Sequence, residues 1–190
     1  MGQGCSAVSD GWLTFRTIGG LPFEAAGSLV VSMKSGRHLI IDGHNILHAW
    51  TDSRLLRGRS MESARARVIA AGLLIHDTED IRVTVVFDGD GEGVSSEDAA
   101  RSSDCAVVFS PASMTADDVI EQLVGGTPGP ADQITVATGD RQERSTVEAL
   151  GAHTISPENF KAWVERCELR QAGRARRDSG NKPFGNVIPL

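Results

Sequence analysis

The chain has 190 residues, 40% of them hydrophobic, which suits one core of ordinary size and is too little for two. Its 19 basic and 25 acidic side chains give a formal net charge of −6, which excludes a protein that coats nucleic acid indiscriminately through a basic surface. Cys5, Cys105 and Cys167 form no CxxC pair and no apolar run approaches the ~18 residues of a membrane span, so we expect a cytoplasmic protein without disulfides, structural zinc or a membrane partner.

From residue 39 onward, short apolar runs alternate with stretches of helical periodicity. The apolar and β-branched runs predict strands at 39–42, 81–88, 105–110, 133–137 and 152–156. Helical spacing and capping residues predict helices at 61–76, 115–124, 141–150 and 156–171. The segment 89–104 is rich in Gly, Ser and acidic residues and is predicted to be a mobile loop. The alternation indicates an α/β fold with a mainly parallel central sheet covered by helices on both faces.

The regions on either side of this pattern are predicted to lie outside the folded domain, which we place at 37–165. Residues 1–36 show no sustained period, so we expect a poorly ordered leader, or a natural start at Met33. Residues 166–190 are expected to form a basic C-terminal tail, because residues 161–190 carry seven basic and three acidic side chains. Arg174, Arg176 and Arg177 are its candidates for binding a polyanion. The alternative is a solvated helix end followed by a disordered tail.

Three acidic residues each follow directly from a predicted strand: Asp42, Asp88 and Asp140. In an open parallel sheet, ligands bind beyond the carboxyl ends of the strands, near the point where the strand order reverses. We therefore expect the three carboxylates to lie at one rim of the sheet. Asn45, close behind Asp42, can donate and accept hydrogen bonds without adding charge, and is a candidate to orient a water molecule or a phosphate.

A further group of acids stands at the predicted helix start near Thr115, namely Asp117, Asp118 and Glu121. Carboxylates packed closely raise one another's pKa unless a cation neutralises them. A site with oxygen ligands and no His or Cys cluster favours Mg²⁺ or Mn²⁺. We take Asp42, Asp88, Asp117, Asp118 and Asp140 as candidate metal ligands and Thr115 as a candidate substrate contact. Such a site suits hydrolysis of a phosphodiester.

Each acid also has a structural interpretation. Asp118 can complete a capping box with Thr115. Asp140 can cap the helix that follows it, with Glu143 completing a similar box, and Asp88 can be a turn former ahead of a glycine. Asp42 is the hardest to explain structurally, because no helix is predicted directly after it.

Four segments, IIDGHNILHAW, VVFDGDG, MTADDVIEQL and ITVATGDRQE, resemble in order and separation the NYN family of PIN-like nucleases, specifically its YacP-like branch. The resemblance covers about residues 37–165. It implies a PIN-like Rossmannoid three-layer sandwich, dependence on Mg²⁺ or Mn²⁺, and endonucleolytic cleavage of RNA, with some members acting on ribosome-associated messenger RNA. It assigns catalytic positions to Asp42, Asn45, Asp117 and Asp140, and Asp88 matches the acid that ends the family's VVFD strand.

The chain departs from the family pattern in two places, and two other functions remain open. His44 stands where an aromatic residue is frequent, and the loop 89–104 is acidic where YacP-like proteins tend to carry lysines. FDGDG at 87–91 resembles the nucleophile loop of haloacid-dehalogenase phosphatases, with Asp88 as nucleophile and Asp90 as acid. The third alternative is an RNA-binding module without turnover. The sequence gives no indication of an oligomeric state.

Overall fold

A computed structural model describes residues 36–51, 60–99, 104–127 and 129–180. Apart from Gly36, the predicted leader lies outside the described residues, as does the closing segment 181–190. The elements in chain order are β1 (His38–Asp42), α1 (Gly43–Thr51), α2 (Met61–Glu79), β2 (Arg82–Gly91), β3 (Ser95–Asp98), β4 (Cys105–Pro111), α3 (Ala116–Gly126), a 3-10 turn (Ala131–Gln133), β5 (Ile134–Ala137), α4 (Arg141–Ala149), β6 (His153–Ile155) and α5 (Pro157–Gly180).

The described strands form one six-stranded sheet in the order β3-β4-β2-β1-β5-β6. β1 lies at its centre and pairs in parallel with β2 on one side and β5 on the other. β4 and β6 continue the parallel arrangement, and among the described strands β3 alone is antiparallel, along β4 at one edge. The predicted α/β class with a mainly parallel sheet is therefore confirmed.

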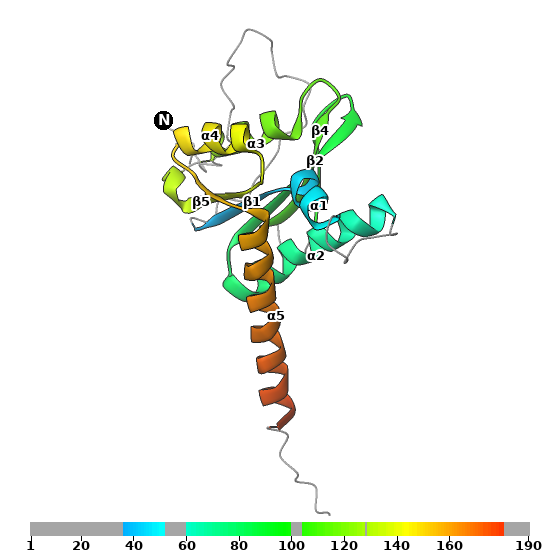
Figure 1. The fold of residues 1–190 in the computed structure, drawn as a ribbon, viewed down its shortest axis with the longest axis vertical. Helices are drawn as coiled ribbons and strands as arrows, with labels where there is room; N and C mark the ends of the chain where they lie inside the picture. The colour runs from blue at the N-terminus through cyan, green and yellow to red at the C-terminus, as the bar shows by residue number, and fades with distance from the viewer. Residues whose placement is uncertain (1–35, 52–59, 100–103, 128, 181–190) are drawn as a thin grey trace, which may run out of the picture.

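Helices cover both faces of the sheet and make three layers (Figure 1). One core cluster joins α1, α2 and α5 to the sheet through side chains such as Ile46, Val68 and Phe160. The other joins α3 and α4 to the opposite face through Ile120 and Val147. β1 is buried along its whole length, as expected of a central parallel strand covered on both sides.

Two elements differ from the sequence-based expectation. The prediction of a loop over 89–104 is wrong in part, because β2 continues to Gly91 and β3 occupies Ser95–Asp98. β3 has little intrinsic preference for a strand and is held by pairing with β4, which is a tertiary effect. The sequence pattern also does not predict α1, which begins directly after Asp42.

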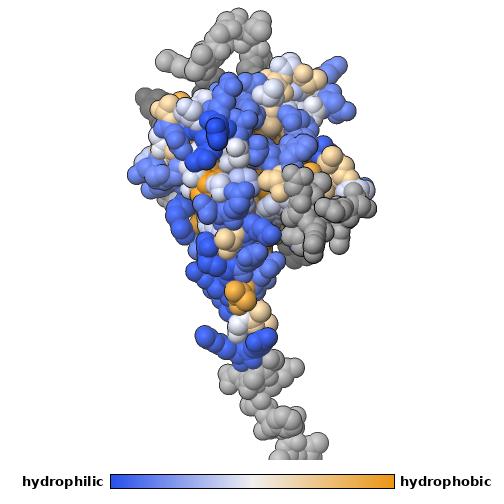
Figure 2. Space-filling model, viewed as in Figure 1, coloured by the Kyte–Doolittle hydropathy of each residue, from blue (hydrophilic) through white to orange (hydrophobic). Residues whose placement is uncertain are grey.

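α5 runs on to Gly180, beyond the predicted end at 171 and across the predicted boundary between domain and tail at 165. Phe160, Val164 and Cys167 are buried in its first half, whereas residues 168–177 are exposed. Figure 1 shows this second half projecting away from the body. The face seen in Figure 2 is mainly hydrophilic, with scattered hydrophobic side chains. None of the described helices is long and apolar enough to cross a membrane.

Candidate active site

The strand order reverses between β1 and β5, because β1, β2 and β4 extend the sheet in one direction and β5 and β6 in the other. Such a reversal is where parallel sheets bind ligands, beyond the carboxyl ends of the strands. β1 ends at Asp42, and β5 leads through Thr138 and Gly139 to Asp140. Both connections open onto the same rim, and each is followed at once by a helix.

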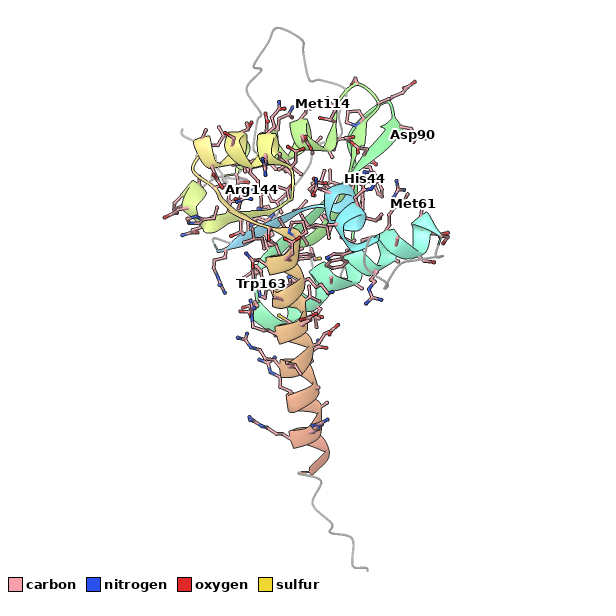
Figure 3. All side chains as sticks on the ribbon, viewed as in Figure 1. His44, Met61, Asp90, Met114, Arg144 and Trp163 are labelled. Atoms are coloured by element: carbon pink, nitrogen blue, oxygen red, sulfur yellow. The ribbon has the colours of Figure 1, made fainter. Side chains whose placement is uncertain are left out.

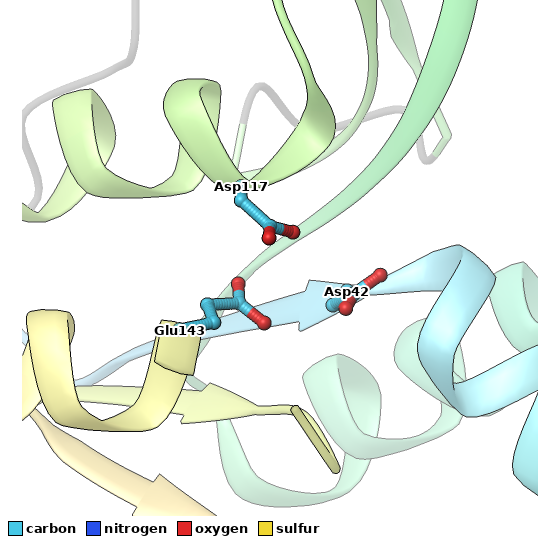
Figure 4. A group of neighbouring side chains, drawn as sticks. All are labelled: Asp42, Asp117 and Glu143. Atoms are coloured by element: carbon cyan, nitrogen blue, oxygen red, sulfur yellow. The ribbon is translucent and has the colours of Figure 1, made fainter. Parts of the chain in front are cut away.

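Three carboxylates from different elements meet at this rim: Asp42 from the end of β1, Asp117 from the first turn of α3, and Glu143 from the first turn of α4. Ligand oxygens of the three lie within 4.8 Å of one another. Figure 4 shows Asp117 reaching from one side toward Asp42 and Glu143. Asp42 and Glu143 are buried, with 4% and 2% of their surface exposed, and Asp117 is exposed. Two of the three carboxylates are therefore buried, and the third, that of Asp117, faces solvent.

Ionising all three carboxylates without a cation is unfavourable. Burial raises the pKa of Asp42. Burial, together with the nearby charges of Asp42 and Asp117, raises the pKa of Glu143 to about 8. Burial also raises the pKa of Asp117, and the surrounding carboxylates, Asp42 first among them, add to this rise. A group of acids that resists ionisation in this way is characteristic of a functional site and accepts a cation readily.

The two buried carboxylates, Asp42 and Glu143, differ in the donors that their oxygens meet. Asp42 Oδ1 accepts a bond from the backbone N–H of Asn45 (3.0 Å), and Oδ2 accepts one from the hydroxyl of Thr138 (3.3 Å). The hydroxyl of Thr138 lies beside both carboxylates, and its bond to Asp42 is the one that meets hydrogen-bond geometry. Both oxygens of Glu143 are buried, and the described residues donate no hydrogen bond to either. A divalent cation bound by oxygen ligands fits these residues, because it satisfies atoms that no described donor satisfies.

The segment that bears Asp117 is fixed by hydrogen bonds on either side of it. Thr115 and Asp118 form a reciprocal capping box, in which Thr115 Oγ1 accepts from the Asp118 N–H and Asp118 Oδ2 accepts from the Thr115 N–H. Asp88 Oδ1 accepts a bond from the backbone N–H of Ala116 at 2.8 Å. Thr115, Asp118 and Asp88 thus hold the start of α3, where the side chain of Asp117 is left free to face the cluster.

Asp140 plays the same structural part at α4. Its Oδ1 accepts bonds from the backbone N–H groups of Gln142 (2.7 Å) and Glu143 (3.1 Å). The Oδ1 of Asn45 accepts a bond from the Gly139 N–H at 2.7 Å, which fastens α1 to the loop after β5. A Cβ on Gly139 would lie 2.7 Å from that oxygen, so a larger residue there would displace the Asn45 amide from this bond. Asp140 remains close enough for its charge to raise the pKa of Asp117.

The turn after β1 needs a glycine for a similar reason. A Cβ on Gly43 would lie 2.3 Å from the ring of Phe87. The interpretation that Asp42 has no helix to cap is wrong, because α1 begins at Gly43 and the Asn45 N–H bonds to Asp42. Asp42 therefore combines a capping role with its place in the cluster.

His44 lies at the border of the site. Its Nδ1 is 2.8 Å from Asp88 Oδ2, and its Nε2 is 3.4 Å from a terminal nitrogen of Arg65. Arg65 in turn packs over the ring of Phe87, with its Cζ 5.5 Å from the ring centroid. Asp88 thus joins the start of α3 through Oδ1 to the first helix through Oδ2, a structural role for the residue that the phosphatase alternative takes as nucleophile.

The remaining candidates lie away from the cluster. Asp90 is exposed on the outer part of β2, and Arg174, Arg176 and Arg177 are exposed near the end of α5. Arg174 is seventeen positions beyond the start of α5 at Pro157, so it lies roughly 26 Å along the helix at a rise of about 1.5 Å per residue. The arginines of α5 therefore do not belong to the carboxylate cluster.

Glu143 is the member of the cluster that the sequence does not identify as a ligand. Its spacing indicates only half of a capping box with Asp140. The signal that could have found it is its place three residues after the strand-end acid, one helical turn into α4. A side chain at that position in the first turn of α4 lies at the same rim of the sheet as Asp42.

Comparison with known proteins identifies the family of the chain. A family model described as the YacP-like NYN domain matches residues 39–184. The chain is 31% identical over 150 residues to uncharacterized protein YacP of Bacillus subtilis strain 168, covering 78% of this chain and 87% of that protein. A crystal structure of Rae1 (YacP) from Bacillus subtilis matches with a TM-score of 0.63 at 32% identity, over 78% of this chain and 85% of that one. A crystal structure of the same protein with a tryptophan replaced by leucine matches with a TM-score of 0.63 at 30% identity, over 76% and 85%. The chain belongs to the YacP-like NYN domain family, a branch of the PIN-like nucleases.

Proposed function

We propose that this protein is a divalent-metal-dependent endoribonuclease that hydrolyses phosphodiester bonds of RNA. The observation that carries the proposal is the trio Asp42, Asp117 and Glu143, whose ligand oxygens lie within 4.8 Å of one another and whose buried member Glu143 has no described hydrogen-bond donor. Membership of a nuclease family supports the reaction class.

Mg²⁺ or Mn²⁺ is the proposed cofactor, because all three side chains offer oxygen. Asp42, Asp117 and Glu143 would hold it. When bound, such an ion supplies positive charge that activates a water molecule and stabilises the charge developing on the phosphate. Without an ion, Glu143 keeps its proton at neutral pH, since its pKa lies at about 8.

The other predicted site residues fix the positions of the three proposed ligands. Asn45 and Thr138 orient Asp42, and Asn45 also anchors the loop that leads into α4. Asp88, Thr115 and Asp118 fix the first turn of α3, and Asp140 fixes the first turn of α4. We propose that these residues act by positioning Asp117 and Glu143. The loss of activity on replacing one of these residues should then depend on how far Asp117 or Glu143 moves when the cap is removed.

The finer substrate proposal is RNA that the projecting end of α5 helps to hold, including messenger RNA on the ribosome. Arg174, Arg176 and Arg177 supply the positive charge for this interaction. A strand that reaches both these arginines and the carboxylates must span more than one nucleotide, because the two sites are far apart along α5.

The test is cleavage of a circular RNA by the purified protein with Mn²⁺, with EDTA, and with the neighbouring variants Asp117→Asn and Asp118→Asn. A circle has no ends, so its opening reports internal cleavage. We expect Mn²⁺-dependent opening that Asp117→Asn reduces by more than about 100-fold, beyond the usual effect of a residue that supports a ligand indirectly. Asp118→Asn is the matched control and should stay within about tenfold of wild type, because an Asn side chain can still accept the Thr115 N–H.

Opening of the circle at the same rate in EDTA would contradict metal dependence. Equal losses in the two variants would contradict the assignment of Asp117 as ligand and Asp118 as cap. Binding of RNA by the wild-type protein with no opening of the circle in Mn²⁺ would favour the inert RNA-binding module.

A further inference from the structure

An open hollow of about 880 Å³ adjoins the carboxylate cluster. It lies between α1, the start of α4 and the start of α5, and we call it the α4–α5 hollow. The side chains that matter for its chemistry are Asn45, His48, Arg141, Gln142, Arg144 and Glu158. Its volume is within the range of about 300–1,000 Å³ that small-molecule sites occupy.

Two residues that line the hollow also form hydrogen bonds that position the carboxylate cluster. Asn45 lines the hollow, and its backbone N–H bonds to Asp42 while its side chain bonds to the Gly139 N–H. Asp140 also lines the hollow and caps the helix that bears Glu143. A polymer whose phosphate sits at the carboxylates therefore has this concavity beside it.

The hollow has two arginines suited to a phosphate. Arg141, the first residue of α4, is exposed, and the described part of the chain gives it no hydrogen bond or ion pair. Arg144 is half-buried, and its Nε donates to Thr154 Oγ1 at 3.2 Å. Thr154 donates in turn to Glu148, so Arg144 is held from behind while its terminal nitrogens have no hydrogen-bond partner among the described residues. Figure 3 shows Arg144 near the chain that leads from α4 into α5. A guanidinium held in this way loses little freedom on binding a phosphate.

The rest of the lining mixes hydrogen-bond donors with acceptors. Gln142 and Asn45 offer amides, His48 an imidazole, and Glu158 a carboxylate. The two arginines are balanced by the carboxylates of Asp140 and Glu158, so the hollow is not a simple polyanion patch. Mixed polar groups beside a pair of cations suit one nucleotide, with a charged phosphate and a polar base edge.

We propose that the α4–α5 hollow binds the nucleotide of the RNA strand next to the cleaved bond, with its phosphate on Arg141 and Arg144 and its base against the polar wall. The proposal rests on the proposed function, because it places the neighbouring phosphate at the carboxylate cluster. Arg141 and Arg144 are then substrate-binding residues that set affinity, whereas the cluster sets the rate of cleavage.

The test compares wild type with the double variant Arg141→Gln, Arg144→Gln. The matched control is Arg67→Gln, Arg166→Gln, which removes two exposed arginines outside the hollow. The probe is a short fluorescein-labelled oligouridine, and fluorescence anisotropy gives its Kd in Ca²⁺ over a salt series. Cleavage of the same strand in Mn²⁺ gives kcat and KM, and thermal unfolding checks that each variant is folded.

We expect the hollow variant to bind about tenfold or more weakly, with a salt slope smaller by about 0.7 if one phosphate of the single strand is no longer neutralised. KM should rise while kcat stays within about threefold, as for the removal of uniform binding. A folded hollow variant with the Kd and salt slope of wild type, or a control that loses as much affinity, would overturn the subsite and leave the nuclease proposal standing. A wild-type protein that neither binds nor cuts the strand would overturn both.

Discussion

Glu143 is a buried side chain that is unfavourable for the fold when ionised and that we propose as a ligand of the site. Its carboxylate is almost completely buried, no described residue donates a hydrogen bond to it, and its pKa rises to about 8. A buried acid without donors costs stability whenever it ionises. On the proposed function, a bound cation would remove that cost, so we expect folding stability to depend on the metal.

The first prediction concerns the substitution Glu143→Gln. Wild-type protein should be stabilised by Mn²⁺, by about 2.7 kcal/mol when the ion is at 100 times its Kd. Glu143→Gln should lose most of this gain and lower cleavage by more than about 100-fold, because one of three charged ligands is gone. Thermal unfolding with and without Mn²⁺ measures the first effect.

The control for that substitution is Glu165→Gln, an exposed position on α5. It should retain the full Mn²⁺-dependent rise in Tm. An unchanged rise in Tm for Glu143→Gln would show that the ion is bound elsewhere.

At the level of single residues, the sequence predicts two of the three clustered acids. Asp42 and Asp117 could be chosen because one ends a buried strand and the other follows a helix-capping threonine. Glu143 could not be chosen by the same reasoning, since strand ends and helix starts point to Asp140. Spacing suggests the capping bonds of Asp118 and Asp140, whereas the bond from the Ala116 N–H to Asp88 joins residues 28 positions apart and depends on the fold.

Among the elements, α1, α3 and α4 each begin with an acidic side-chain cap close to the cluster. Asp42 serves α1, the capping box and Asp88 serve α3, and Asp140 serves α4. Each cap also carries negative charge at the positive end of a helix, which is electrostatically favourable. The site is therefore assembled from helix N-termini as much as from strand ends.

The second prediction distinguishes a cap from a ligand at Asp140. Asn is as good an N-cap as Asp, so Asp140→Asn should keep the stability of the fold and cleavage within about tenfold of wild type. Asp140→Ala should cost about 1 kcal/mol of unfolding free energy and weaken cleavage, because the turn that bears Glu143 is released. Denaturant unfolding and Mn²⁺-dependent cleavage measure the two effects. If Asp140→Asn abolished cleavage as completely as Asp117→Asn, Asp140 would be a ligand.

The sequence predicts most elements because their hydrophobic patterns agree with their final structures. β1, β2, β4 and β5 are apolar runs of strand length, and α3 has a clear apolar face. α1 escapes prediction because GHNILHAW begins with turn-forming residues and continues as an apolar run too short to separate helix from strand. β3 escapes because its sequence, SSED, becomes a strand only through pairing with β4.

For the molecule as a whole, two buried groups at opposite ends of β1 respond to pH in opposite senses. His38 begins β1, and its Nε2 lies 2.9 Å from Thr84 Oγ1. Burial, with the nearby charge of Arg82, lowers the pKa of His38 to about 3. Glu143, at the other end of the sheet, has its pKa raised to about 8.

The third prediction is a stability maximum on the acid side of neutral pH in EDTA, with losses of stability toward lower and toward higher pH. Folding disfavours protonated His38, so stability is lost as pH falls from about 6.5 toward 3. Folding also disfavours ionised Glu143, so stability is lost as pH rises from about 4.5 to 8, and Asp42 and Asp117 act in the same direction. Each single group contributes a slope of about 1.4 kcal/mol per pH unit within its window. The His38 and Glu143 slopes offset one another between about pH 4.5 and 6.5, and ionisation of Asp42 and Asp117 adds a net loss as pH rises.

Chemical denaturation across pH tests this profile in wild type and two variants. His38→Gln should flatten the acid side, and Glu143→Gln should reduce the alkaline loss. Mn²⁺ should flatten the alkaline side of wild type. An alkaline side that is the same with Mn²⁺ and with EDTA would contradict a cation at the cluster.

The fourth prediction concerns the exposed half of α5. Replacing Arg174, Arg176 and Arg177 by Gln should weaken binding of a long single-stranded RNA and reduce its salt slope by about 0.7 for each phosphate that is no longer neutralised. Cleavage of a short strand confined to the carboxylate cluster should change little, because these arginines lie far along the helix. An unchanged slope on the long strand would assign them to solubility or to a protein partner.

The central position of β1 has a consequence for how the protein is made. Asp42 and Glu143 are 101 positions apart (143 − 42), and they meet because β5 pairs with β1. No polypeptide that stops before α4 contains the whole trio, so every incomplete translation product of that length lacks the centre. On the proposed function, a nascent chain is therefore inactive until α4 has emerged and β5 has paired with β1, the first strand of the described part of the chain.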